Sequence, residues 1–157
     1  HVQQSDLLDI ELGYLLTLVH TPERNWSACV ELLNGVRSLV GDWTVVEGDF
    51  ATPEQAALRV GELGALLLRN KMNKCAELAL SVAVELDDTV LDVRRLLAEV
   101  LFAEGLYWKA VAQLEVVLTV EPGDEQSFRR LGDCYAQLGV NEAAQMCYAR
   151  SGVTSEV

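Results

Sequence analysis

The stretch that decides the fold is Phe128-Arg-Arg-Leu131-Gly132-Asp-Cys-Tyr135, followed by Gly139, Ala144 and Tyr148. Leu131 and Tyr135 are four residues apart, so they lie on one face of a helix. Gly132 and Ala144 are small enough to let a second helix approach the first closely, and Gly139 permits the turn between them. The stretch therefore predicts a helix–turn–helix hairpin.

The same arrangement occurs twice more, each time about 34 residues upstream. In the first upstream copy the equivalent residues are Leu97, Ala98, Leu101, Gly105, Ala110 and Leu114. In the second they are Leu63, Gly64, Leu67, Lys71, Ala76 and Leu80. Three copies thus follow one another without gaps, at 57–90, 91–124 and 125–157. An ordinary helical bundle with accidental self-similarity is the alternative, but chance does not hold one period over about a hundred residues.

This repeat resembles the tetratricopeptide (TPR) repeat, in which a Leu-Gly pair, an aromatic residue, a turn, an alanine and a second aromatic residue mark a helical hairpin. The resemblance covers 57–157. It implies an all-α fold, a TPR-type α-α superhelix of stacked antiparallel helix hairpins. The expected helices lie near 53–69, 73–87, 91–104, 107–120, 124–137 and 141–151.

The preceding part, 1–40, is expected to form a helical hairpin that resembles a degenerate TPR. A first helix is expected from a cap at Ser5-Asp6 to about His20, because apolar residues recur there at helical spacing: Leu7, Leu8, Leu12, Leu15, Leu16 and Val19. Pro22 predicts that the second helix begins near Glu23, and this helix should run to Val40.

A connecting loop is expected over 41–56, because two glycines and a Thr-Val-Val run oppose a helix there. We expect its apolar side chains to pack back on the helices; they are Trp43, Val45, Val46 and Phe50. Thr52, with Pro53 after it and Gln55 three residues on, predicts a capped start for the next helix.

Composition bounds the function classes. The chain has 157 residues, half of them apolar, and a net charge of −12, which disfavours nucleic acid or an anionic membrane as the partner. Residues 1–56 carry −7 of that charge, which indicates either a basic partner for this part or simply a solvated acidic face. No run of apolar residues is long enough to predict a membrane span.

Nothing in the sequence predicts catalysis. Cys29, Cys75, Cys134 and Cys147 are scattered without a C-x-x-C pair, so they form no zinc or redox motif. Cys134 and Cys147 lie beside core positions of one repeat, and we expect them to be buried free thiols. We also expect a reducing compartment and a cytoplasmic location. Neither histidine has a metal-ligating neighbour at helical spacing. We therefore expect no catalytic residues, no metal, no cofactor and no small-molecule substrate.

The TPR resemblance implies a surface rather than an active site. In that family the first helix of each hairpin lines a concave groove that binds a partner. Carried over by repeat position, the implied groove residues are Leu58, Leu68, Arg69, Arg95, Glu99, Phe102, Arg129 and Asp133. The alternative is that Arg95–Glu99 and Arg129–Asp133 are only i,i+4 ion pairs on a solvated face.

The function that follows is a non-catalytic module or scaffold subunit that binds a peptide or helix of another protein, or self-associates. The runner-up is a small acidic TPR chaperone, similar in plan to those of bacterial type III secretion, which could act as a dimer. The last expected helix leaves apolar residues such as Met146 with little chain after them. Either more chain follows, or a partner or second copy covers that edge.

Overall fold

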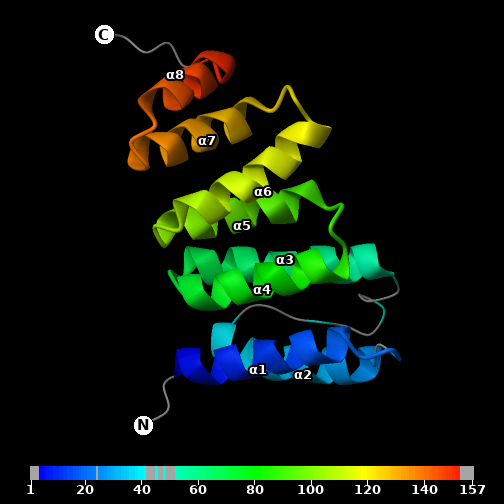
Figure 1. Cartoon of the computed structure of the whole chain (residues 1–157). Helices are drawn as coiled ribbons and strands as arrows, with labels where there is room; N and C mark the ends of the chain where they lie inside the picture. Colours follow the sequence, from blue (N-terminus) through cyan, green and yellow to red (C-terminus); the bar gives the residue numbers. More distant parts are fainter. Residues whose placement is uncertain (1–3, 24, 42–44, 46–47, 49–51, 153–157) are drawn as a thin grey trace. The chain divides into compact units, whose positions relative to one another are not determined.

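The computed structural model describes residues 4–23, 25–41, 45, 48 and 52–152. Within these ranges all regular structure is helical and no strand occurs, so the all-α fold class is confirmed (Figure 1). The chain divides into two compact units, His1–Val93 and Arg94–Val157. Each consists of antiparallel helix hairpins.

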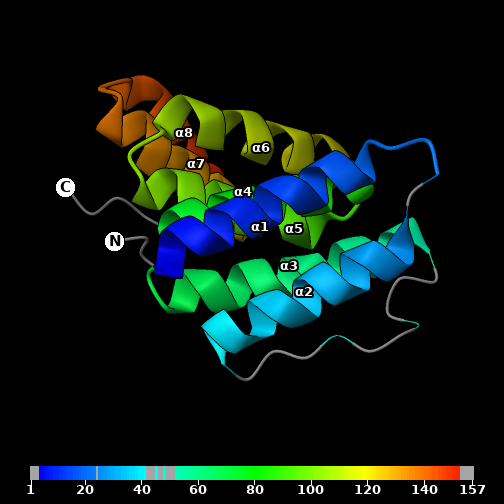
Figure 2. The same ribbon diagram turned by 90° about the horizontal axis from the view of Figure 1, so that it is seen from below.

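The first unit contains α1 (Gln4–Val19), α2 (Trp26–Val40), α3 (Pro53–Arg69) and α4 (Asn73–Leu86). α3 and α4 form one hairpin, and α1 packs against both α2 and α4 (Figure 2). Each helix contributes fully buried aliphatic side chains to the core between them: Leu8, Leu12, Leu15, Leu33, Val36, Leu63, Leu67 and Leu80. Burial of side chains of this size is the main stabilising contribution, at roughly 1.5–3 kcal/mol for each.

The start of α2 differs from the expected one. Pro22 does not begin the helix, which starts instead at Trp26. Asn25 supplies the cap, since its Oδ1 accepts a hydrogen bond from the N–H of Ala28 at 3.2 Å. Asparagine is among the best N-cap residues, and here its side chain overrides the proline signal. The expected cap at Ser5-Asp6 was also wrong, because α1 already begins at Gln4.

The predicted capped start of α3 is confirmed. The Thr52 side chain accepts a hydrogen bond from the N–H of Gln55 at 3.2 Å, and Pro53 occupies the first helical turn. In the connection before it, Val45 is buried, and its N–H donates to Asn34 Oδ1 at 3.2 Å. Trp43, Val46 and Phe50, also predicted to pack inward, lie outside the described residues.

The second unit contains most of α5 (Leu91–Ala103), then α6 (Tyr107–Val120), α7 (Glu125–Gln137) and α8 (Asn141–Arg150). α7 and α8 form a hairpin, and α7 packs on α6. The six helices predicted from the repeat, α3 to α8, agree with the structure to within one residue at each end and are confirmed.

The turns inside the three repeat hairpins share one backbone conformation. Lys71, Gly105 and Gly139, spaced by the repeat period, have φ of 59°, 78° and 79°. This left-handed conformation suits glycine and strains a residue with a Cβ. The period is therefore present in the backbone as well as in the side chains.

Within two of the hairpins a glycine allows the helices to approach. A Cβ placed on Gly64 would lie 2.5 Å from Leu80 Cγ, and one on Gly132 would lie 2.7 Å from Tyr148 Cε1. Ala98 stands at the corresponding position of the middle hairpin and is fully buried. The small residue predicted at this position is thus required by the packing of the opposite helix.

Among the described residues no helix is both long and apolar enough to cross a membrane.

We expect Gly139→Ala to lower the free energy of unfolding by about 1–2 kcal/mol, because alanine is strained at positive φ. The added Cβ would meet nothing within 4 Å, so the loss is one of backbone conformation. Gly123→Ala is the matched control, since Gly123 has equally open space and no positive φ. Urea denaturation measures both variants, and equal stabilities would contradict the assignment.

Gly132→Ala and Gly13→Ala should have opposite signs. The first overpacks against Tyr148 and should lower the stability by about 1–3 kcal/mol, with Gly132→Leu worse. The second fills open space in α1, where nothing lies within 4 Å, and should raise it by up to about 1 kcal/mol through helix propensity. Thermal unfolding followed by circular dichroism measures both; a Gly132→Ala variant as stable as the wild type would show that this close approach is not required.

Candidate protein-binding site

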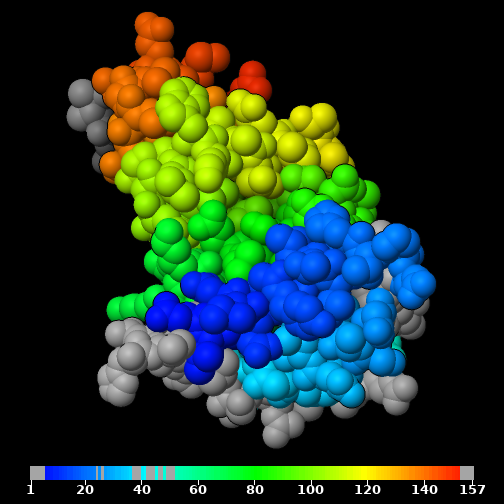
Figure 3. Space-filling view, turned by 60° about the horizontal axis from the view of Figure 1, so that its bottom comes forward, coloured from blue at the N-terminus to red at the C-terminus, as the bar shows by residue number. Residues whose placement is uncertain are grey.

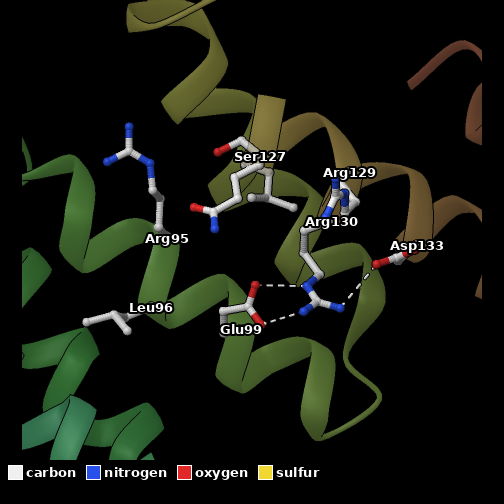
Figure 4. A pocket seen from close by; sticks show the side chains of 9 residues that line it. Arg95, Leu96, Glu99, Ser127, Arg129, Arg130 and Asp133 are labelled. Atoms are coloured by element: carbon white, nitrogen blue, oxygen red, sulfur yellow. Dashed lines mark hydrogen bonds and ion pairs between the residues drawn. The ribbon is translucent and has the colours of Figure 1, made fainter. Parts of the chain in front are cut away.

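A cavity of about 330 Å³ opens in the second unit between α5, α6 and α7. Its lining combines three arginines with two acids and two leucines: Arg95, Leu96, Glu99, Leu114, Gln126, Ser127, Arg129, Arg130 and Asp133. Figure 4 shows Glu99 on α5 facing Arg130 on α7 across this cavity. Four of the predicted groove residues, two from α5 and two from α7, are therefore brought together here.

Arg95 connects α5 to the start of α7. Its Nε donates to Asp124 Oδ2 at 2.8 Å, and its guanidinium also pairs with Glu121. Asp124 in turn accepts a hydrogen bond from Ser127 Oγ at 2.6 Å. Burial acts to raise the pKa of Asp124, but the hydrogen bonds from Ser127 and Arg95 outweigh it and lower the pKa below its usual value. Asp124 is thus held as a carboxylate that fixes Arg95.

Arg130 makes a two-point contact across the cavity. Its Nε and Nη2 donate to the two carboxylate oxygens of Glu99, both at 2.8 Å, and its Nη1 donates to Asp133 at 3.2 Å. Such a two-point arginine–carboxylate contact fixes geometry as well as charge. Partial burial acts to lower the pKa of Arg130, but Glu99 and then Asp133 outweigh it and raise the pKa.

Asp133 extends this network to α8. Its Oδ1 accepts a hydrogen bond from the Tyr148 hydroxyl at 2.6 Å. Burial, followed by the bond to Asp133, raises the pKa of Tyr148 to about 12, so the phenol stays a donor at neutral pH. Helices α5, α7 and α8 are joined in this way by one chain of polar contacts.

Phe102 stands beside the network. Its ring meets that of Tyr107 edge-on at 5.3 Å between centroids, and the Arg130 guanidinium carbon lies 4.5 Å from its centroid. A cation over an aromatic face is stabilising, by about 0.5–1 kcal/mol at exposed sites. Phe102 is only half-buried, so it combines a packing role with an accessible apolar face.

Arg129 differs from the other two arginines of the cavity. It is exposed and lines the cavity, and no ion pair joins it to another described residue. Its guanidinium therefore presents donors to solvent at the rim of a cavity whose other charges are paired.

The remaining predicted groove residues lie on α3 in the first unit. Leu58 is 43% exposed, Leu68 is half-buried and Arg69 is exposed in the last turn. Gly61, also on α3, is buried, and a Cβ there would come within 2.9 Å of Val93 Cγ2.

The alternative interpretation of two i,i+4 pairs on a solvated face does not describe these charges. Arg95 pairs with residues 26 and 29 positions later, and Glu99 pairs with Arg130, 31 positions later. Arg130, which joins α5 to α7, is absent from the predicted groove residues. One signal was present in the sequence, because acids and arginines recur on α5 and α7, the first helices of consecutive hairpins. The i,i+4 rule considers pairs within one helix, so it does not detect contacts between helices.

The buried free thiols expected at Cys134 and Cys147 are confirmed, and Cys29 and Cys75 are free and buried as well. Burial, helped by a hydrogen bond to Asp9, raises the pKa of Cys75 to about 12, and burial raises that of Cys134 to about 11. These thiols stay protonated at neutral pH, whereas the thiolate is the reactive form. The described residues contain no group of side chains suited to hold a metal ion.

The arrangement of antiparallel hairpins, with turns at one period and a small residue at each close approach, fits a TPR fold. The sequence matches no protein-family model and no curated protein. Among solved structures the chain is similar to MamA: one crystal structure shares 18% identity, with 94% of this chain and 76% of that chain covered at a TM-score of 0.61.

A point mutant of MamA shares 19% identity, with 96% of this chain and 98% of that chain covered, also at a TM-score of 0.61. A third MamA structure shares 17% identity over 96% and 94% of the two chains, at a TM-score of 0.60. At these identities the likeness shows the fold alone.

The lowered pKa of Asp124 gives a prediction in acid. A carboxylate whose folded pKa lies below its unfolded value stabilises the protein fully above the unfolded pKa, and this stability is lost as the pH falls through the folded pKa. We therefore expect the stability difference between wild type and Asp124→Asn to be largest at neutral pH and to shrink below about pH 4. Urea midpoints measured across the acid range test this; a pH-independent difference would contradict the role of the charge.

Proposed function

We propose that this chain is a non-catalytic protein-interaction module, or scaffold subunit, that binds a peptide or helix of a partner protein at the α5–α7 cavity. The observation that carries the proposal is Arg129. It is an exposed cation at the rim of a cavity in which Arg95 and Arg130 are already held by acids. An acidic side chain of a partner that paired with Arg129 would give all three arginines of the cavity a carboxylate.

The apolar part of the cavity supplies the second requirement. Leu96 of α5 is half-buried and Leu114 of α6 is 2% exposed, and both line the cavity. A partner side chain that covers them would gain apolar burial beside the acidic contact. Interfaces usually concentrate their binding energy in a few such anchors. The preferred ligand is therefore a segment with an apolar residue close to Asp or Glu.

The fixed charges favour binding without rearrangement. Glu99, Arg130 and Asp133 are bonded to one another before a ligand arrives, so their side chains lose little further freedom on binding. The same contacts exclude Arg95 as a clean test of binding. Arg95→Glu would place a third acid beside Glu121 and Asp124, which would destabilise the unit itself.

The test is a selection of peptides from a displayed random library on the purified chain, followed by measurement of the dissociation constant of the enriched peptide. We expect enrichment of acidic residues next to apolar ones. Arg129→Glu should weaken binding at least about tenfold, since it replaces attraction by repulsion. Its effect on stability should be small, because the residue is exposed and makes no ion pair with a described residue.

Lys109→Glu is the matched control, because Lys109 is an exposed cation on α6 outside the cavity lining. It makes the same change of net charge and should leave the affinity unchanged. An equal loss in both variants would indicate non-specific attraction, and an unaffected Arg129→Glu variant would overturn the proposed site.

A further inference from the structure

α1 is apolar on two opposite faces. Its inner face carries Leu8, Leu12 and Leu15, which are at most 1% exposed and belong to the core of the first unit. A helix that is apolar all round is normally covered on all sides, whereas a surface helix is polar on the face away from the core. The outer face of α1 is apolar although it faces away from the core.

The outer face carries Leu7, Ile10 and Tyr14, which are 45%, 64% and 56% exposed. Their spacing of three and then four residues places them in one line along the helix. We call these three residues the α1 stripe. Figure 3 shows α1, in dark blue, lying at the surface of the first unit. The α1 stripe has the spacing with which one helix packs along another.

The charged side chains of α1 itself are all of one sign. α1 contains Asp6, Asp9 and Glu11 and neither lysine nor arginine. Asp9 is turned inward, where it accepts a hydrogen bond from Cys75 Sγ at 3.3 Å. Asp6 and Glu11 lie on the two sides of the stripe by helical position. An apolar line between acidic flanks is complementary to an apolar line between basic flanks.

This charge pattern chooses between possible occupants. A second copy that docked α1 on α1 would bring acids against acids with no basic residue on either helix to offset them, which is unfavourable. An anionic lipid surface would be repelled for the same reason. A helix with lysine or arginine beside its apolar side chains would bury those side chains against the stripe and would also be attracted to the acids of α1.

We propose that the α1 stripe is a docking surface for a basic amphipathic helix of another protein. Leu7, Ile10 and Tyr14 contact its apolar face, and the negative charge of α1, with Glu11 beside the stripe, attracts its flanking cations. This surface lies in the first unit and is separate from the α5–α7 cavity of the second, so its failure and the failure of the proposed function are distinguishable.

Two synthetic helical peptides of about five turns would be used as probes. Both have leucines at i, i+3 and i+7; one has lysines on the flanks and the other has glutamates at the same positions. We expect the wild type to bind the lysine peptide at least about tenfold more tightly than the glutamate peptide, with an affinity that falls as salt is added. Ile10→Asn should reduce that binding at least about tenfold.

Met146→Asn is the matched control, because Met146 is also 64% exposed but lies on α8 in the other unit. It should bind the lysine peptide like the wild type, and thermal unfolding should show that both variants remain folded. Equal affinity for the two peptides, or equal loss in both variants, would overturn the proposal. So would a concentration-dependent dimer in light scattering that Ile10→Asn abolishes, because a second copy would then occupy the stripe.

Discussion

The close approach of two helices inside a hairpin is the constraint on which the second unit depends. Gly132 has no side chain, and the Tyr148 ring lies in the space that a Cβ would take. From that position the Tyr148 hydroxyl reaches Asp133 at 2.6 Å, and Asp133 contacts Arg130. A packing requirement at Gly132 therefore sets the position of a polar contact at the next residue, Asp133.

The consequence continues across the unit. Arg130, oriented by Asp133, takes both oxygens of Glu99 and lies over the ring of Phe102. Partly buried ion pairs of this kind offset the cost of removing their charges from water and add little net stability. Their value here is orientation, because they fix which groups line the cavity and which remain available. The availability of Arg129 is meaningful because its two neighbouring arginines are engaged.

What could be predicted from the sequence follows from the range of each interaction. The helices α3 to α8 were predictable because each repeat contains the same short-range pattern at the same spacing. That spacing alone placed Lys71 at the turn position. The start of α2 was missed because two short-range signals compete there, and Asn25 prevails over Pro22. Packing around the close approach was predictable because the small residue and its large partner recur together.

The site was less predictable because its contacts join residues far apart in the sequence. Arg95 and Arg129 were singled out by repeat position, which does not distinguish a paired arginine from an available one. The difference is that Asp124 and Glu121, in the loop before α7, hold Arg95, whereas Arg129 is exposed. Likewise, the apolar pattern of α1 included Leu7 among residues at helical spacing, but only packing against α2 and α4 decides which apolar face is covered.

The two proposed surfaces differ in the charge that they require of a partner. The α5–α7 cavity offers Arg129, which forms no ion pair with a described residue, and therefore favours an acidic segment, whereas the α1 stripe lies between acids and favours a basic one. One segment of uniform charge cannot bind well at both surfaces, because an acidic segment that is attracted to Arg129 is repelled by Glu11. The charge asymmetry of the chain, with its acidic excess in residues 1–56, thus has a specific consequence. Under the two proposals, it separates the two surfaces by the sign of charge that each would accept.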